Sequence, residues 1–78
     1  MGNPITNKLP YDIDSFLQDI AQMENLFSYG DIMEFGNRVK EEDIEKLTKL
    51  KRQSYEEYQK YGKISEKTLI AIKQIVVL

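Results

Sequence analysis

Hydrophobic residues recur at three- and four-residue steps along this chain, and that spacing limits what the chain can fold into. The first run begins at Ile13 and continues to Phe27, which is the pattern of an amphipathic helix. No segment alternates apolar and polar residues convincingly as a strand would. Because 78 residues leave room for a single core, the sequence predicts an all-α protein, a small single-core bundle of four to five helices. We expect residues 11–78 to form this domain and residues 1–10, which hold both prolines, to form a flexible N-terminal arm.

Turn and cap signals divide the first half of the domain into two helices. The first is predicted over residues 13–28, because Gly30 can adopt the left-handed conformation that ends a helix. Asp31 begins a second helix, with capping-box spacing to the carboxylate three residues later. A break near residues 37–41 is expected, since a continued helix would turn Ile44 away from the apolar side.

A lysine interrupts the apolar stripe of the next segment. From Glu41 the apolar positions fit either one helix to about Tyr61 or two short helices that meet near residues 49–51. One continuous helix would place Lys51 near the middle of the apolar side, where its ammonium must reach solvent or be desolvated. Of the two alternatives, we therefore favour the turn.

The last helix carries the clearest start signal in the chain. Gly62 ends the preceding region, Ser65 is a good N-cap, and Ile64 can pack on Leu69. The helix from about residue 66 is apolar on most sides, so it is either the central core helix or one half of a homodimer interface. The expected core residues are Phe16, Leu17, Ile20, Phe27, Phe35, Ile44, Leu47, Leu69, Ile72 and Val76.

The composition excludes most enzyme chemistry. With no Cys and no His, the chain has no thiol nucleophile, no disulfide, no zinc finger and no imidazole acid or base. Its glycines stand alone, so no phosphate-binding loop forms, and its clustered carboxylates diverge around a helix instead of converging on a metal. We expect a protein that is not an enzyme, with no cofactor, metal or small-molecule substrate. No apolar run is long enough to span a membrane, and we expect a soluble, cytoplasmic protein.

The segment from Val39 to Val76 resembles a known family. The apolar residues of its first part lie where Cro-like and phage-repressor-like helix-turn-helix domains place core residues; they are Val39, Ile44, Leu50, Tyr55 and Tyr58. The Gly62-Lys63 pair and the opening of the following helix are similar to the loop and next helix of that family. The resemblance covers about half of the chain and implies a helix-turn-helix at residues 41–60.

That resemblance implies a DNA-binding transcriptional regulator. The helix from Arg52 to Gln59 would enter the major groove of double-stranded DNA N-terminus first. Base edges would be read by Arg52, Gln53 and Ser54, and phosphates would be held by Lys49, Lys51 and Lys63.

The alternative is a small helical protein-binding module, such as an inhibitor, an antitoxin-like or immunity-like protein, or an assembly adaptor. It would use the acidic first helix, the tyrosines and the apolar C-terminal helix. Residues 1–36 hold one cation and six carboxylates, whereas residues 37–78 hold ten cations and seven carboxylates, so the first helix is acidic. Tyr55, Tyr58 and Tyr61 recur at three-residue intervals. They are either anchors for a partner protein or residues at the edge of the core, with buried rings and hydroxyls in water.

Overall fold

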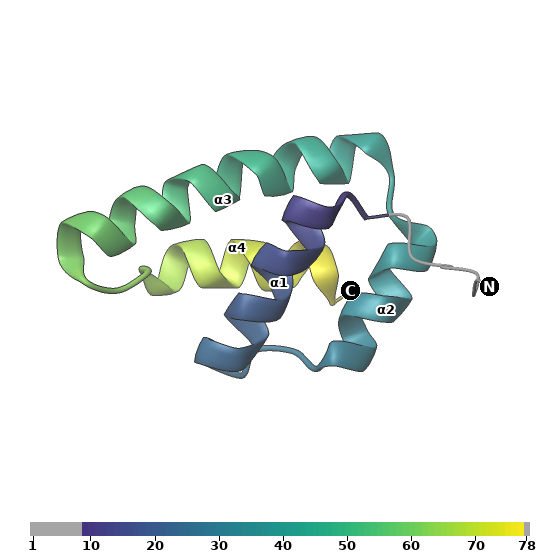
Figure 1. Ribbon diagram of the computed structural model, residues 1–78, viewed down its shortest axis with the longest axis horizontal. Helices are drawn as coiled ribbons and strands as arrows, with labels where there is room; N and C mark the ends of the chain where they lie inside the picture. Colours follow the sequence, from purple (N-terminus) through teal and green to yellow (C-terminus); the bar gives the residue numbers. More distant parts are fainter. Residues whose placement is uncertain (1–8, 78) are drawn as a thin grey trace.

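The computed structural model describes residues 9–77, and four α-helices account for most of them (Figure 1). The helices are α1 (Tyr11–Glu24), α2 (Tyr29–Arg38), α3 (Glu41–Tyr61) and α4 (Glu66–Val76). The prediction of a small all-α bundle is confirmed. The predicted arm lies outside the described residues apart from Leu9 and Pro10. None of the helices in the described range is long and apolar enough to cross a membrane.

The boundary between α1 and α2 differs from the prediction. α1 ends at Glu24, because Asn25 adopts the left-handed conformation (φ 56°) and its N–H donates to the Ala21 carbonyl. Four residues later Ser28 begins α2: its Oγ accepts the Asp31 N–H at 3.1 Å, and the Asp31 carboxylate accepts the Ser28 N–H at 2.8 Å. The capping box was therefore predicted one turn too late, and the predicted helix over residues 13–28 is wrong at both ends.

The turn predicted at residues 49–51 is wrong, because α3 continues without interruption for 21 residues. No glycine or proline lies between Glu41 and Tyr61 to break it. Three carboxylates precede lysines by four residues on its solvent side, the spacing and order that stabilise a helix; they are Glu42 and Lys46, Glu45 and Lys49, and Glu56 and Lys60. Lys51 does not break the helix, since its side chain extends to Asp12 of α1. Residues 41–60 therefore do not form two helices joined by a turn.

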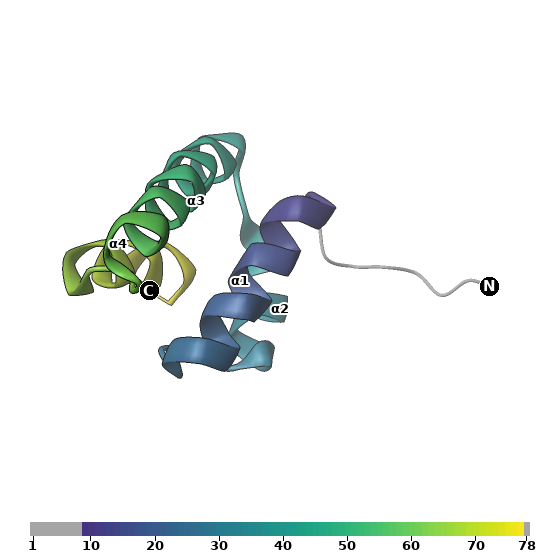
Figure 2. The same cartoon turned by 60° about the vertical axis from the view of Figure 1, so that its left-hand side comes forward.

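α3 and α4 form an antiparallel pair joined by a short connection (Figures 1 and 2). Gly62 ends α3 in the left-handed conformation (φ 76°), and its N–H donates to the Tyr58 carbonyl at 2.8 Å. Ser65 caps α4, where its Oγ accepts the Thr68 N–H at 3.3 Å. The predicted end at Gly62 and start at residue 66 are both confirmed.

Most side chains of the core come from α1, α2 and α4, and α3 contributes Leu47. α1 packs on α2 and α3, and α2 also packs on α4. The buried apolar side chains are Ile13, Leu17, Ile20, Phe27, Ile32, Phe35, Leu47, Ile64, Leu69, Ile72 and Val76. Of the expected core residues, Phe16 and Ile44 are only partly buried. Leu69, Ile72 and Val76 place α4 within the core, and Ile70 is its one large apolar residue among those described that is exposed.

Arg38 joins the C-terminal ends of α2 and α4. Its Nη2 donates to the Val76 carbonyl at 2.7 Å, and its guanidinium lies 5.2 Å from the centre of the Phe35 ring. A carbonyl in the last turn of α4, which has no partner within its own helix, is satisfied in this way.

The position of the core can be tested on two isoleucines of α4. Ile72→Ala should lower the free energy of unfolding by about 2 to 5 kcal/mol, because it leaves a cavity in a fully buried site. Ile70→Ala, on the exposed side of the same helix, should change it by less than about 0.5 kcal/mol. Urea unfolding followed by circular dichroism measures both. Equal losses at the two positions would contradict this placement of the core.

Candidate functional site

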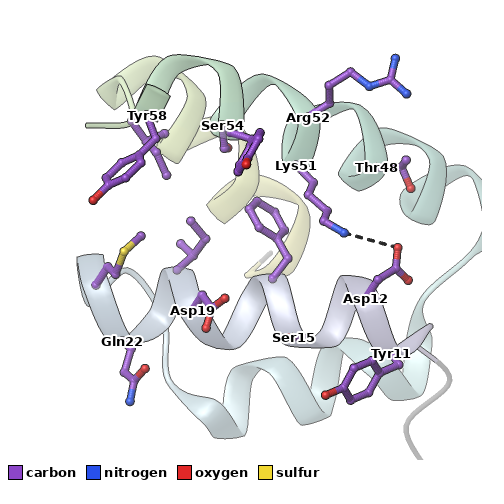
Figure 3. Close-up of a pocket in the computed structure, with 15 residues that line it drawn as sticks. Tyr11, Asp12, Ser15, Asp19, Gln22, Thr48, Lys51, Arg52, Ser54 and Tyr58 are labelled. Carbon is purple, nitrogen blue, oxygen red and sulfur yellow. Dashed lines mark ion pairs between the residues drawn. The ribbon is translucent and has the colours of Figure 1, made fainter. Parts of the chain in front are cut away.

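An open groove of about 990 Å³ lies between α1 and α3. The two helices run side by side in the same direction along it (Figure 3). From α1 it is lined by Phe16, Ile20 and Met23, with Asp12, Ser15, Asp19 and Gln22 in the next row and Tyr11 at the start of the helix. From α3 it is lined by Thr48, Lys51, Arg52, Ser54, Tyr55 and Tyr58. Ile64, just before α4, also contributes. We refer to this feature as the α1–α3 groove.

The groove follows from the residues that occupy the inner side of α3. Leu47 is fully buried and fills its position on that side. One and two turns further along, the same side carries Lys51 and Ser54. The lysine side chain crosses to Asp12 at one end and the serine is small, so neither fills the space with apolar atoms as a leucine would. The gap in the stripe, which suggested a turn from sequence alone, leaves a groove beside a straight helix.

An ion pair crosses the groove at one end. Lys51 Nζ lies 3.5 Å from Asp12 Oδ2, and Figure 3 shows the lysine side chain spanning the space between the two helices. Both side chains are well exposed, at 41% and 62%, so the pair contributes at most about 1 kcal/mol to stability. The pair therefore serves to neutralise this end of the groove more than to hold α1 against α3.

Large apolar side chains are exposed along the groove. Tyr55 is 65% exposed, Tyr58 53% and Met23 55%. Figure 3 shows Tyr58 extending from α3 toward α1. The interpretation that the tyrosine rings are buried at the core edge is therefore wrong. Tyr61 is exposed as well, but it does not line the groove. Exposed aromatic and methionine side chains gathered in one concave surface are typical of binding sites for proteins.

A polar cluster behind the groove fixes the start of α4 to the last turns of α3. Glu57 Oε1 accepts the Ser65 N–H at 2.8 Å, and Glu57 Oε2 accepts the Thr68 hydroxyl at 2.7 Å. Gln53 Nε2 donates to Glu57 Oε2 at 3.1 Å and to Thr68 Oγ1 at 3.0 Å. These hydrogen bonds lower the pKa of Glu57 to about 2. The bond from the Ser65 N–H has the largest effect, and those from the Thr68 and Gln53 side chains come next.

The residues expected to read bases do not face one surface. Arg52 is exposed and points away from α1 (Figure 3). The amide of Gln53 is committed to Glu57 and Thr68. Ser54 is only 2% exposed, and its hydroxyl has no hydrogen-bond partner in the part of the chain that is described.

The lysines expected to hold phosphates are also dispersed. Lys51 faces Asp12 in the groove, whereas Lys49 is exposed on α3 and Lys63 is exposed in the connection to α4. Sequence reasoning identified Tyr55, Tyr58 and the acidic first helix as partner-binding candidates, but it did not single out the α1 residues that line the groove, such as Phe16, Asp19 and Met23. The signal that could have indicated the groove is the lysine in the apolar stripe, which was instead interpreted as a turn.

Comparison with models of protein families, with curated proteins and with solved structures finds no match for this chain. Within residues 9–77, no group of three acidic side chains is placed to hold a metal ion. The groove itself is therefore the basis for inferring a function.

The Glu57 cluster predicts a specific acid dependence of stability. Because the pKa of Glu57 is lower in the folded protein than its ordinary value of 4.5, its stabilising effect is present above that value and is lost as the pH falls toward 2. Glu57→Gln should flatten the decline in stability over this range, measured by thermal unfolding at a series of pH values. Glu56→Gln is the control, since it removes the same charge and leaves the cluster intact. A Glu57→Gln profile that parallels the wild type would contradict this role.

The origin of the groove can be tested at Lys51. Lys51→Leu should raise the free energy of unfolding by about 1 kcal/mol, because the added apolar contact outweighs an exposed ion pair. Asp12→Asn breaks the same ion pair without adding apolar surface and should be neutral or slightly destabilising. Urea unfolding measures the free energy of unfolding of both variants. If Lys51→Leu destabilises as much as Asp12→Asn, the ion pair matters more than the unfilled space.

Proposed function

We propose that this protein is a small non-enzymatic binding module that holds an amphipathic helix of a partner protein in the α1–α3 groove. The observation that carries this proposal is the exposure of Met23, Tyr55 and Tyr58 on a single groove. Burying these side chains would provide the apolar centre of an interface, and tyrosine is common among residues that dominate binding energy. An inhibitor, an antitoxin-like or immunity-like protein and an assembly adaptor would all use such a surface.

The shape of the groove favours a helix over an extended peptide. Its α1 wall extends from Tyr11 to Met23, which at 1.5 Å per residue is about 18 Å, or some three turns of a helix. A helix satisfies its own backbone hydrogen bonds and needs from the groove only a place for apolar side chains at i, i+3 or i+4, and i+7. A peptide in β-strand conformation would bind by adding to the edge of a sheet, and the described residues contain no strand.

The DNA-binding function implied by the family resemblance stays a prediction, and no contact in the structure favours it. α3 lacks the turn that would separate a recognition helix from its support. Its solvent side alternates carboxylates with cations, for example Glu45 with Lys49 and Glu56 with Lys60, whereas binding to phosphates needs an excess of cations.

The proposal is tested with a displayed library of amphipathic helices, about four turns long, selected on the wild-type protein. We expect selected helices to bind saturably, and Tyr58→Ala and Tyr55→Ala to weaken them about tenfold or more, since truncating an interface anchor costs at least 1 to 2 kcal/mol. Tyr61→Ala is the matched control, because it removes the same side chain from the same helix outside the groove. Fluorescence anisotropy measures the affinities.

Two results would contradict the proposal. One is the recovery of no helix, or only of helices that Tyr61→Ala weakens as much as Tyr58→Ala. The other is binding to random duplex DNA that falls steeply with salt and is weakened by Lys49→Ala and Lys63→Ala but not by the tyrosine changes. That second result would support the DNA-binding regulator instead.

A further inference from the structure

The α1 wall of the groove is acidic. α1 contains four carboxylates and no lysine or arginine. Two of these, Asp12 and Asp19, line the groove. They are seven residues apart, which places them on one side of the helix about 10.5 Å apart along its axis. An occupant of the groove therefore passes both carboxylates.

Only one of the two carboxylates on this wall is neutralised within the described chain. Asp12 pairs with Lys51, the cation that α3 extends across the groove. Asp19 is exposed and forms no ion pair within residues 9–77. Arg52, the other groove-lining cation of α3, points away from α1 (Figure 3). The α1 wall thus has a neutral end at Asp12 and a single uncompensated negative charge at Asp19.

The neighbours of Asp19 make this charge sensitive to what occupies the groove. The α1 residues that line the groove next to it are the neutral Ser15 and Gln22 in its own row, and the apolar Phe16 and Ile20 beneath. An apolar occupant would remove water from one side of the carboxylate and would leave the charge without compensation. A cation on the occupant would restore that compensation, whereas a carboxylate would be repelled.

We propose, resting on the proposed function, that the partner helix is cationic and carries a lysine or arginine beside its apolar stripe that pairs with Asp19. The apolar stripe supplies affinity by covering Met23, Tyr55 and Tyr58. The cation supplies selectivity, because it distinguishes helices that share the same apolar spacing. Lys51 is already paired with Asp12, so the charge preference is centred on Asp19.

The test is a double-mutant cycle on one helix recovered from the library. Each lysine or arginine of that helix is changed to glutamate, and the affinity of every variant for wild-type protein and for Asp19→Lys is measured by anisotropy in low salt. We expect one position whose reversal weakens binding to the wild type about fivefold to tenfold. The same reversal should strengthen binding to Asp19→Lys, because the pair is restored with opposite signs. Raising the salt concentration should reduce the difference.

Glu34→Lys is the matched control, since it makes a charge reversal at an exposed site on α2 outside the groove. The inference about charge is overturned if the recovered helices carry no cation, or if no reversal depends on Asp19. It is also overturned if Glu34→Lys has the same effect as Asp19→Lys, which would reflect total charge only. In each of these cases, if binding of the helix still depends on Tyr58, the proposed function is retained and only the inference about charge fails. Recovery of no helix at all, or light scattering that shows a dimer of this chain that Tyr58→Ala abolishes, overturns both.

Discussion

The unbroken α3 helix is the element that joins the core, the start of α4 and the groove. Its N-terminal half places Leu47 in the core, together with buried side chains of the other three helices. Its C-terminal half carries the Glu57 cluster that fixes the start of α4, and it also presents Tyr55 and Tyr58 to the groove. A turn in the middle of α3 would separate the half that carries Leu47 from the half that carries Glu57 and the two tyrosines. Because the helix is unbroken, one element packs on α1 and α4 and also carries one wall of the groove.

The features that could be predicted from sequence are the ones decided by neighbouring residues. Ser65 and Gly62 act within one turn of the helix ends that they determine, so the start of α4 and the end of α3 were correct. The end of α1 was missed because Asn25, which is not a glycine, adopts the left-handed conformation. Asparagine tolerates this conformation better than most residues, but its presence alone does not indicate it.

The features that could not be predicted depend on residues far apart in the sequence. The sequence shows that Lys51 lies in an apolar stripe, but it does not show that the lysine pairs with Asp12, which lies 39 positions earlier on a different helix. The exposure of Tyr58 depends on how closely α1 approaches α3, and Ser54 and Lys51 together leave that space unfilled. Periodicity identified which residues share a side of α3, but it gave no information about which side another helix would cover.

The short connection between α3 and α4 has a consequence for the order in which contacts become favourable. Bringing these two helices together closes a loop of only residues 62–65, whereas bringing α1 to α3 closes the whole stretch of residues 25–40. The entropy lost on loop closure rises with the number of residues enclosed, so the α3–α4 pair is the less costly of the two to form. Contacts between neighbours in sequence also favour rapid folding. By this measure the α3–α4 hairpin costs less entropy to close than the contact between α1 and α3 that brings the two walls of the groove together.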